Sequence, residues 1–245
     1  MTTDETDTEQ SPFTRPGFIV AAVVVAIVVV LGAVAVIMAL TSNSSPSAAA
    51  PSAPASATPT TRPTGNTSVC GLDGVVLSGT VATPPAAEWK FQGTTAYPTS
   101  ATAGPAETTP DGVRRCFQHT PQGALFAASN AVVQGSDVAV QAAFAQYFIA
   151  AGPGRAAAIS NAVSGSASTG RLELVAFRVL KYDGATANVD VAVRATSTGQ
   201  TIYSSGVYPL RWEGGDWKLQ VSDTGQMTYA FAQIPDLAGY ISWGR

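Results

Sequence analysis

Charged residues are scarce in the first quarter of this sequence, and none lies between Arg15 and Arg62. Within that gap, the run from Phe18 to Leu40 is apolar throughout. A helix of 23 residues is about 34 Å long, enough to cross a hydrocarbon core of about 30 Å. The sequence therefore predicts a single transmembrane helix over residues 18–40, preceded by a short acidic tail over residues 1–17.

The alternative to an uncleaved anchor is a cleaved signal peptide, which has a basic leader and an apolar stretch of only about 7–15 residues. Here the leader is acidic, with Asp4, Glu5, Asp7 and Glu9, and no cysteine follows the apolar run to accept a lipid. We therefore expect an uncleaved anchor. Arg15 is the only cation near either end of the run, and cations stay on the cytoplasmic side. This predicts a single-pass cell-membrane protein with a cytoplasmic N-terminus and an extracytoplasmic C-terminal domain.

Large apolar and aromatic residues are missing from the next segment, Thr41–Ser68, which consists almost wholly of Ser, Ala, Pro and Thr. Such a segment cannot bury enough surface to offset its chain entropy. We expect a disordered linker that holds the outer domain away from the membrane. Asn66-Thr67-Ser68 matches the N-glycosylation triplet, which is a weak match by itself.

Neither charge sign dominates the remaining residues, 69–245, which have the length of one domain. They hold twelve acidic and eleven basic residues, a net charge of −1, and no basic stripe. This balance argues against nucleic acid and against an anionic membrane surface as partners.

Cysteine is limited to Cys70 and Cys116, and two thiols in an oxidising compartment most simply form one disulfide. Closing that loop stabilises the fold by up to about 4 kcal/mol on the chain-entropy model. The alternative, a redox pair, has no Cys-x-x-Cys spacing and no basic neighbour at Cys70 to support it. Because prolines punctuate the loop, we expect little regular structure in it, with Trp89 and Phe91 as its anchors.

The one histidine, His119, limits the chemistry that the chain can support. A Ser-His-Asp arrangement could be built only around it, and one histidine with two paired cysteines leaves no zinc or copper set. No phosphate-binding glycine loop and no calcium spacing occurs. We expect no cofactor, no metal and no catalytic residue, a structural role for His119, and turn roles for Asp183 and Asp216.

The centre of the domain reads as helical. Thr120 before Pro121 is a helix-start signal for a first helix over residues 123–133. Ser136 is expected to cap a second helix, with Asp137 in its first turn and apolar residues at helical spacing as far as Ala151. A short third helix is expected over 155–163.

After residue 170 the apolar period changes to that of strands. Residues 172–182 are apolar on both faces, Asp183-Gly184 is a hairpin turn, and residues 187–195 alternate cleanly. Further strands are expected over 202–212 and 217–221, around Gly214-Gly215. The fold class is therefore α+β, with helices packed on one face of a curved, four-stranded antiparallel sheet.

Several motifs carry a resemblance to a known family. They are Cys70-Gly71-Leu72, Cys116–Ala124, Gly152-Pro153-Gly154-Arg155, Tyr182-Asp183-Gly184 and Trp212–Lys218. Together they resemble an uncharacterised actinobacterial family of single-pass, membrane-anchored proteins, whose members are often encoded near conjugative or phage-like elements. Helices followed by a meander that ends in Gly-Asp-Trp-Lys also resemble the cone-shaped, nuclear-transport-factor-2-like fold. That fold includes the outer domains of proteins in conjugation channels, although a fold does not dictate function.

Three function classes stay open at this point. The first is a non-enzymatic component of a cell-envelope assembly with protein partners, for example a conjugative transfer apparatus. The second is a ligand-binding or enzymatic domain with a pocket between helices and sheet, whose small-molecule ligand is unknown. The third is a surface exclusion or receptor protein of a mobile element.

The tail Ile234–Trp243 is a possible partner surface, because Leu237, Tyr240 and Trp243 recur at spacings suited to docking. Its alternative role is to cover the domain's own core.

Overall fold

A computed structural model describes residues 67–163, 171–197, 200–227 and 231–245, all within the unit Pro59–Arg245. The expected cytoplasmic tail, the expected membrane span over 18–40 and nearly all of the expected linker lie outside the described residues. No helix in the described part is long and apolar enough to cross a membrane. Ser68, the last residue of the expected linker, is buried, so the folded domain has begun by this position.

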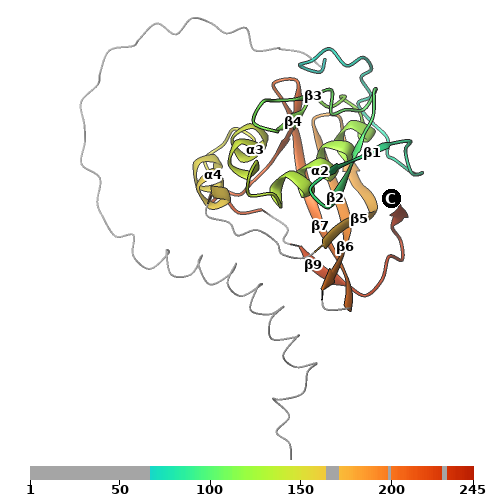
Figure 1. The fold of residues 1–245 in the computed structure, drawn as a ribbon. Helices are drawn as coiled ribbons and strands as arrows, with labels where there is room; N and C mark the ends of the chain where they lie inside the picture. The colour runs from blue at the N-terminus through green and yellow to red at the C-terminus, as the bar shows by residue number, and fades with distance from the viewer. Residues whose placement is uncertain (1–66, 164–170, 198–199, 228–230) are drawn as a thin grey trace, which may run out of the picture. The chain divides into compact units, whose positions relative to one another are not determined.

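Three helices lie beside the long strands: the first in the chain packs directly on them, and the second contacts the first and the third (Figure 1). They are α2 (Pro121–Gly135), α3 (Gln141–Phe148) and α4 (Arg155–Val163). The predicted start of α2 is confirmed, because Thr120 Oγ1 accepts a hydrogen bond of 3.0 Å from the Gly123 N–H, with Pro121 in the first turn.

The predicted start of α3 is wrong. Ser136 lies at the C-terminal end of α2, and α3 begins after Val140, with no side-chain cap. Asp137 Oδ1 instead accepts from the Ala139 N–H at 2.9 Å and closes a turn between the helices. Helix α3 also ends at Phe148, before Ala151, because Ile149 is extended and bridges to strand β8.

The main sheet contains the four predicted strands and two more. The predicted strands are β5 (Arg171–Tyr182), β6 (Thr186–Ser197), β7 (Gln200–Glu213) and β8 (Asp216–Leu219), each antiparallel to the next. The others follow β8 in the chain: β9 (Ala232–Ile234) pairs with β7, and β10 (Ile241–Ser242) pairs with β5. The expectation of a four-stranded sheet is therefore corrected to six strands, and the α+β class with helices beside an antiparallel sheet is confirmed.

The loop between the cysteines is more regular than expected. It holds a hairpin of β1 (Glu88–Gln92) and β2 (Thr95–Thr99), and a small pair of β3 (Glu107–Thr108) and β4 (Arg114–Arg115). Trp89 is an anchor as expected, because its ring meets that of Trp243 edge-to-face at 5.2 Å. Phe91 is 49% exposed, so the prediction that it anchors the loop is wrong.

Buried polar residues of α2 hold this loop to the helix. Asn130 Nδ2 donates to Pro98 O at 2.9 Å, and Gln134 Oε1 accepts from the Arg114 N–H at 2.6 Å. Arg114 Nε donates to Asn130 Oδ1 at 2.7 Å, and its guanidinium lies 3.8 Å from the centroid of the Tyr97 ring. Burial lowers the pKa of Arg114 to about 10. The guanidinium has thus lost water, and its contacts with Asn130 and the Tyr97 ring take the place of that water.

The core lies between α2 and strands β5–β7. One face of β6 contributes Ala187, Val189, Val191 and Val193, all buried, and Phe126 and Leu125 of α2 are fully buried. The opposite face of β6 carries Asp190, whose Oδ2 accepts from Arg178 and Tyr240. The alternation predicted for this strand therefore separates an apolar core from a polar outer face.

Candidate functional site: the disulfide region and a neutral groove

The two cysteines form the predicted disulfide, with Cα atoms 5.7 Å apart. Cys70 is exposed and Cys116 is fully buried. Val69, beside the bridge, donates its N–H to Gly215 O at 2.8 Å. The bridge therefore ties the first described residues to the segment before α2, next to the turn between β7 and β8.

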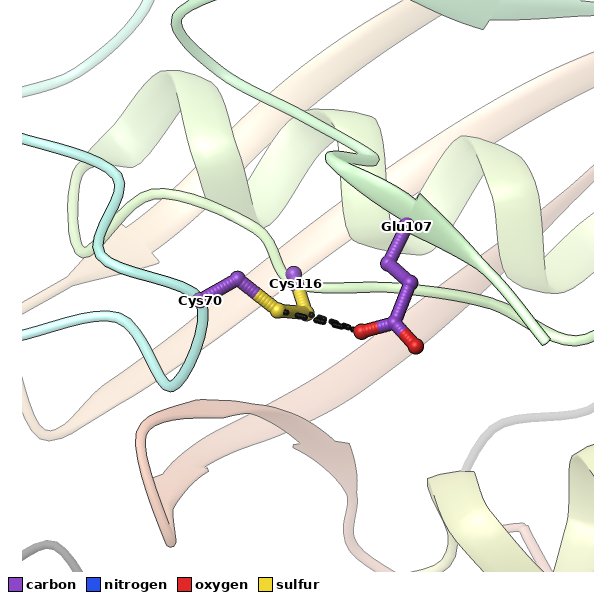
Figure 2. A group of neighbouring side chains, drawn as sticks. All are labelled: Cys70, Glu107 and Cys116. Atoms are coloured by element: carbon purple, nitrogen blue, oxygen red, sulfur yellow. Dashed lines mark hydrogen bonds between the residues drawn. A yellow bond between two sulfur atoms is a disulfide. The ribbon is translucent and has the colours of Figure 1, made fainter.

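A carboxylate faces the disulfide (Figure 2). Glu107 Oε2 lies 3.4 Å from Cys70 Sγ and 3.7 Å from Cys116 Sγ, while Oε1 accepts from Arg115 Nη2 at 2.8 Å. Reactive cysteines lie in positive surroundings that favour the thiolate, whereas a neighbouring carboxylate disfavours it. The geometry favours a structural disulfide over the redox alternative.

Within the described residues, Cys70, Glu107 and Cys116 form the one group of three whose ligand atoms are close enough to hold a metal ion, all within 4.8 Å. Zinc binds cysteine as the thiolate. Since both sulfurs are joined in the disulfide, the oxidised domain offers only the carboxylate, so these residues do not fit a metal site in this state.

Asp216 connects the disulfide region to the sheet. Its Oδ2 accepts from the Cys116 N–H at 2.8 Å and from the Tyr147 hydroxyl at 2.7 Å, and its Oδ1 accepts from the Phe117 N–H at 2.9 Å and the Trp217 N–H at 3.0 Å. The carboxylate is 1% exposed. Asp216 was expected to be a turn residue only, and that interpretation missed its contacts a hundred residues away, which no local pattern signals.

Cations gather at the C-terminal end of α3, where helix carbonyls lack partners. Lys218 Nζ donates to Tyr147 O at 2.9 Å and lies 3.1 Å from the centroid of that ring. Arg155 donates to the carbonyls of Gln146 and Ile149, and Arg211 Nη2 donates to Ala151 O at 2.7 Å.

Burial lowers the pKa of Lys218 to about 8, and burial with the nearby Asp216 raises the pKa of Tyr147. An amine with so low a pKa is chemically able to act as a base or nucleophile. Here its contacts are with the backbone and ring of Tyr147, which is a helix-capping arrangement.

His119 is packed between aromatic rings, in line with the structural role expected from sequence. Its ring stacks on Trp212 with centroids 3.9 Å apart and meets Trp217 edge-on at 5.7 Å. Nε2 lies 2.6 Å from Gly184 O, and the side chain is 2% exposed. His119 thus joins the segment before α2 to the β5–β6 hairpin turn.

An open groove lies between residues 74–85 and the start of α2, with a volume of about 480 Å³. Its lining has no ionisable side chain and consists of Gly74, Val76, Ser78, Gly79, Thr80, Val81, Ala82, Thr83, Pro85, Gln118, Thr120, Pro121 and Gln122. Sequence reasoning missed this groove, because its two walls are neighbours only after folding.

The tail residues lie in different environments. Trp243 is buried and packs edge-to-face against Phe126 and Phe177, while its Nε1 donates to Pro85 O at 2.9 Å. Trp243 therefore covers the domain's own core, the alternative that the sequence left open for the tail. Tyr240 and Leu237 are half-buried, and the Tyr240 hydroxyl bonds to Asp190 and Ser205.

Comparison with known proteins gives a family without a known activity. A family model described as a domain of unknown function (DUF8175) matches residues 49–242. No curated protein and no solved structure matches the chain. The match spans the disulfide, the groove and the whole main sheet, and the chain therefore belongs to the DUF8175 family of domains of unknown function.

Proposed function

We propose that this protein is a non-enzymatic, membrane-anchored component of a cell-envelope assembly, with its folded domain outside the cytoplasm. A conjugative transfer apparatus is the assembly that the family resemblance suggests, and the nuclear-transport-factor-2-like fold is the finer fold proposed for the domain. The 23-residue apolar run supports the anchor, and the disulfide fits an oxidising compartment.

One observation carries the non-enzymatic part of the proposal: the groove has no ionisable group in its lining. General acids, bases and activated nucleophiles are ionisable side chains positioned in a pocket. The described side chains whose pKa values are shifted do not line the groove, and two of them, Lys218 and Tyr147, are engaged at the end of α3. A domain of this kind acts through binding.

In-cell photo-crosslinking of the full-length protein tests the proposal. A photoreactive amino acid is placed, one site at a time, at the exposed apolar positions Val69, Val75, Val76, Leu77, Phe91, Val138, Leu180 and Phe231. We expect a group of neighbouring positions to give a discrete adduct with one envelope protein, while the others do not. The proposal is contradicted if no position gives a protein adduct and the purified protein retains a small molecule, which would support the ligand-binding alternative.

A further inference from the structure

Three consecutive large apolar residues are exposed at one edge of the groove. Val75, Val76 and Leu77 have exposed fractions of 42%, 46% and 49%. An exposed apolar run of this length is unfavourable in a monomer unless it has a function. The residues after it, as far as Thr83, carry no charge and no proline, which are the devices that normally protect exposed backbone edges from pairing with other chains.

The segment Leu77–Pro84 is held in place at both ends. At its start, the Val76 N–H donates to His119 O at 2.9 Å, and the Tyr182 hydroxyl donates to Val76 O at 2.5 Å. At its end, Trp243 Nε1 donates to Pro85 O at 2.9 Å. The half-buried Val81 packs against the core between these points. A segment fixed in this way loses little conformational entropy when it binds.

Between these ends the backbone makes no hydrogen bonds within the described part of the chain. The segment Leu77–Pro84 contains seven N–H groups and eight carbonyls, and none of them has a partner there. Most of its residues are exposed. Bends at Ser78 and Thr83 and the positive φ of 114° at Gly79 confine the stretch without a bend to Thr80–Ala82. Free donors and acceptors in such a stretch beside a groove can pair with an extended peptide, as in strand addition.

The groove indicates the chemistry of the occupant. Its volume of about 480 Å³ lies in the range of about 300–1,000 Å³ that is usual for ligand sites. Its lining is uncharged and includes the hydroxyl groups of Ser78, Thr80 and Thr83 and the amide of Gln122. A charged side chain would lose hydration there without gaining an ionic partner.

We propose that the segment Leu77–Pro84 is a binding edge for an uncharged, extended peptide segment of a partner protein. The peptide backbone pairs with the free backbone groups of Thr80–Ala82, and its apolar side chains contact Val76 and Leu77. This inference rests on the proposed function, because it names the surface through which the domain binds its partner.

The test uses the full-length protein, purified in detergent, and two phage-displayed libraries of random 12-residue peptides. One library contains uncharged residues only, and the other has charged residues at half of its positions. We expect binders from the uncharged library. Thr80→Lys should weaken their binding at least tenfold, whereas Thr94→Lys, at an exposed position in the β1–β2 turn, should leave it unchanged. Hydrogen exchange of residues 77–83 should slow when the peptide is bound.

Backbone pairing has its own signature. Successive N–H groups of a strand point to opposite sides. N-methylation of every second peptide residue should therefore abolish binding in one register and leave it intact in the other.

Three outcomes overturn the inference: no binder from either library, binding that is insensitive to Thr80→Lys, or equal tolerance of N-methylation in both registers. In each case, photo-crosslinks to an envelope protein from positions away from the groove would still support the proposed function. If no position gives a protein crosslink and the purified protein retains a small molecule, the proposed function is contradicted even though the segment binds its peptide.

Discussion

Replacing Glu107 by glutamine should make the disulfide easier to reduce. An incoming thiolate attacks the exposed Cys70 Sγ, and the sulfur–sulfur bond breaks to leave a thiolate on Cys116. Glu107 Oε2 lies 3.4 Å from the first sulfur and 3.7 Å from the second, so it repels both charges. Glutamine has nearly the same shape and can still accept a hydrogen bond from Arg115. The substitution therefore removes the charge and keeps the contact.

The size of the effect follows from Coulomb's law. Two unit charges 3.7 Å apart, the distance from Glu107 Oε2 to Cys116 Sγ, repel by about 1.1 kcal/mol at the dielectric constant of water, which applies because the Glu107 side chain is 41% exposed. About half of a unit charge develops on a sulfur in the transition state of thiol exchange, which gives about 0.6 kcal/mol, or roughly threefold in rate. Repulsion of the attacking sulfur adds a similar factor, so we expect an acceleration of about three- to tenfold.

Thiol exchange followed by alkylation and mass spectrometry measures this rate. The oxidised full-length protein is treated with glutathione, mercaptoethanol and cysteamine, which carry decreasing negative charge. The difference between Glu107→Gln and the wild type should be largest with glutathione and should shrink in high salt. Glu88→Gln, at an exposed position in β1, is the matched control.

The reasoning is refuted if Glu107→Gln and the wild type are reduced at equal rates by all three thiols. The two oxidised proteins must also have equal free energies of unfolding, because local opening of a less stable variant would itself expose the sulfurs.

Three further predictions follow from the sequence and the site. In the folded protein the pKa of Lys218 is about 8, below its ordinary value of 10.5, so between these two pH values the unfolded state binds more protons. The free energy of unfolding should therefore rise with pH in that window, by up to about 3 kcal/mol. Urea unfolding at pH 7 and 9.5 should show this rise for the wild type and not for Lys218→Met. Replacing Cys70 and Cys116 together by serine should lower the free energy of unfolding by up to about 4 kcal/mol and leave the helical circular dichroism signal, and a loss of all secondary structure would contradict it. A reporter fused after Arg245 should be active only outside the cytoplasm, and N-terminal sequencing that finds a mature start near Thr41 would exclude the uncleaved anchor.

Local signals were sufficient for the longest elements. Strands β5, β6 and β7 were predictable because alternation and the Asp183-Gly184 turn act within a few residues, and α2 because Thr120 caps it. The start of α3 was not, because Ser136 and Asp137 resemble a cap but close a turn between two helices. The cap prediction was wrong there, because Ser136 bonds back to the end of α2 and Asp137 closes the turn that follows.

The remaining elements depend on partners far away in the chain. Strand β10 has two residues, and it exists because Phe177 and Ala176 of β5 pair with it. The site also depends on distant partners. Asp216 accepts hydrogen bonds from Cys116 and Phe117, and the groove forms only where residues 74–85 face the start of α2. Sequence patterns report on neighbours along the chain, and these contacts span up to a hundred residues.

The position of the disulfide has a mechanical consequence. A pull on the chain that precedes Cys70 passes through the sulfur bridge directly to Cys116, whose N–H is bonded to Asp216 on β8. Residues 71–115 then lie outside the path of the force. The bridge therefore transmits such a pull to the main sheet, and the groove wall formed by residues 74–85 carries none of the force.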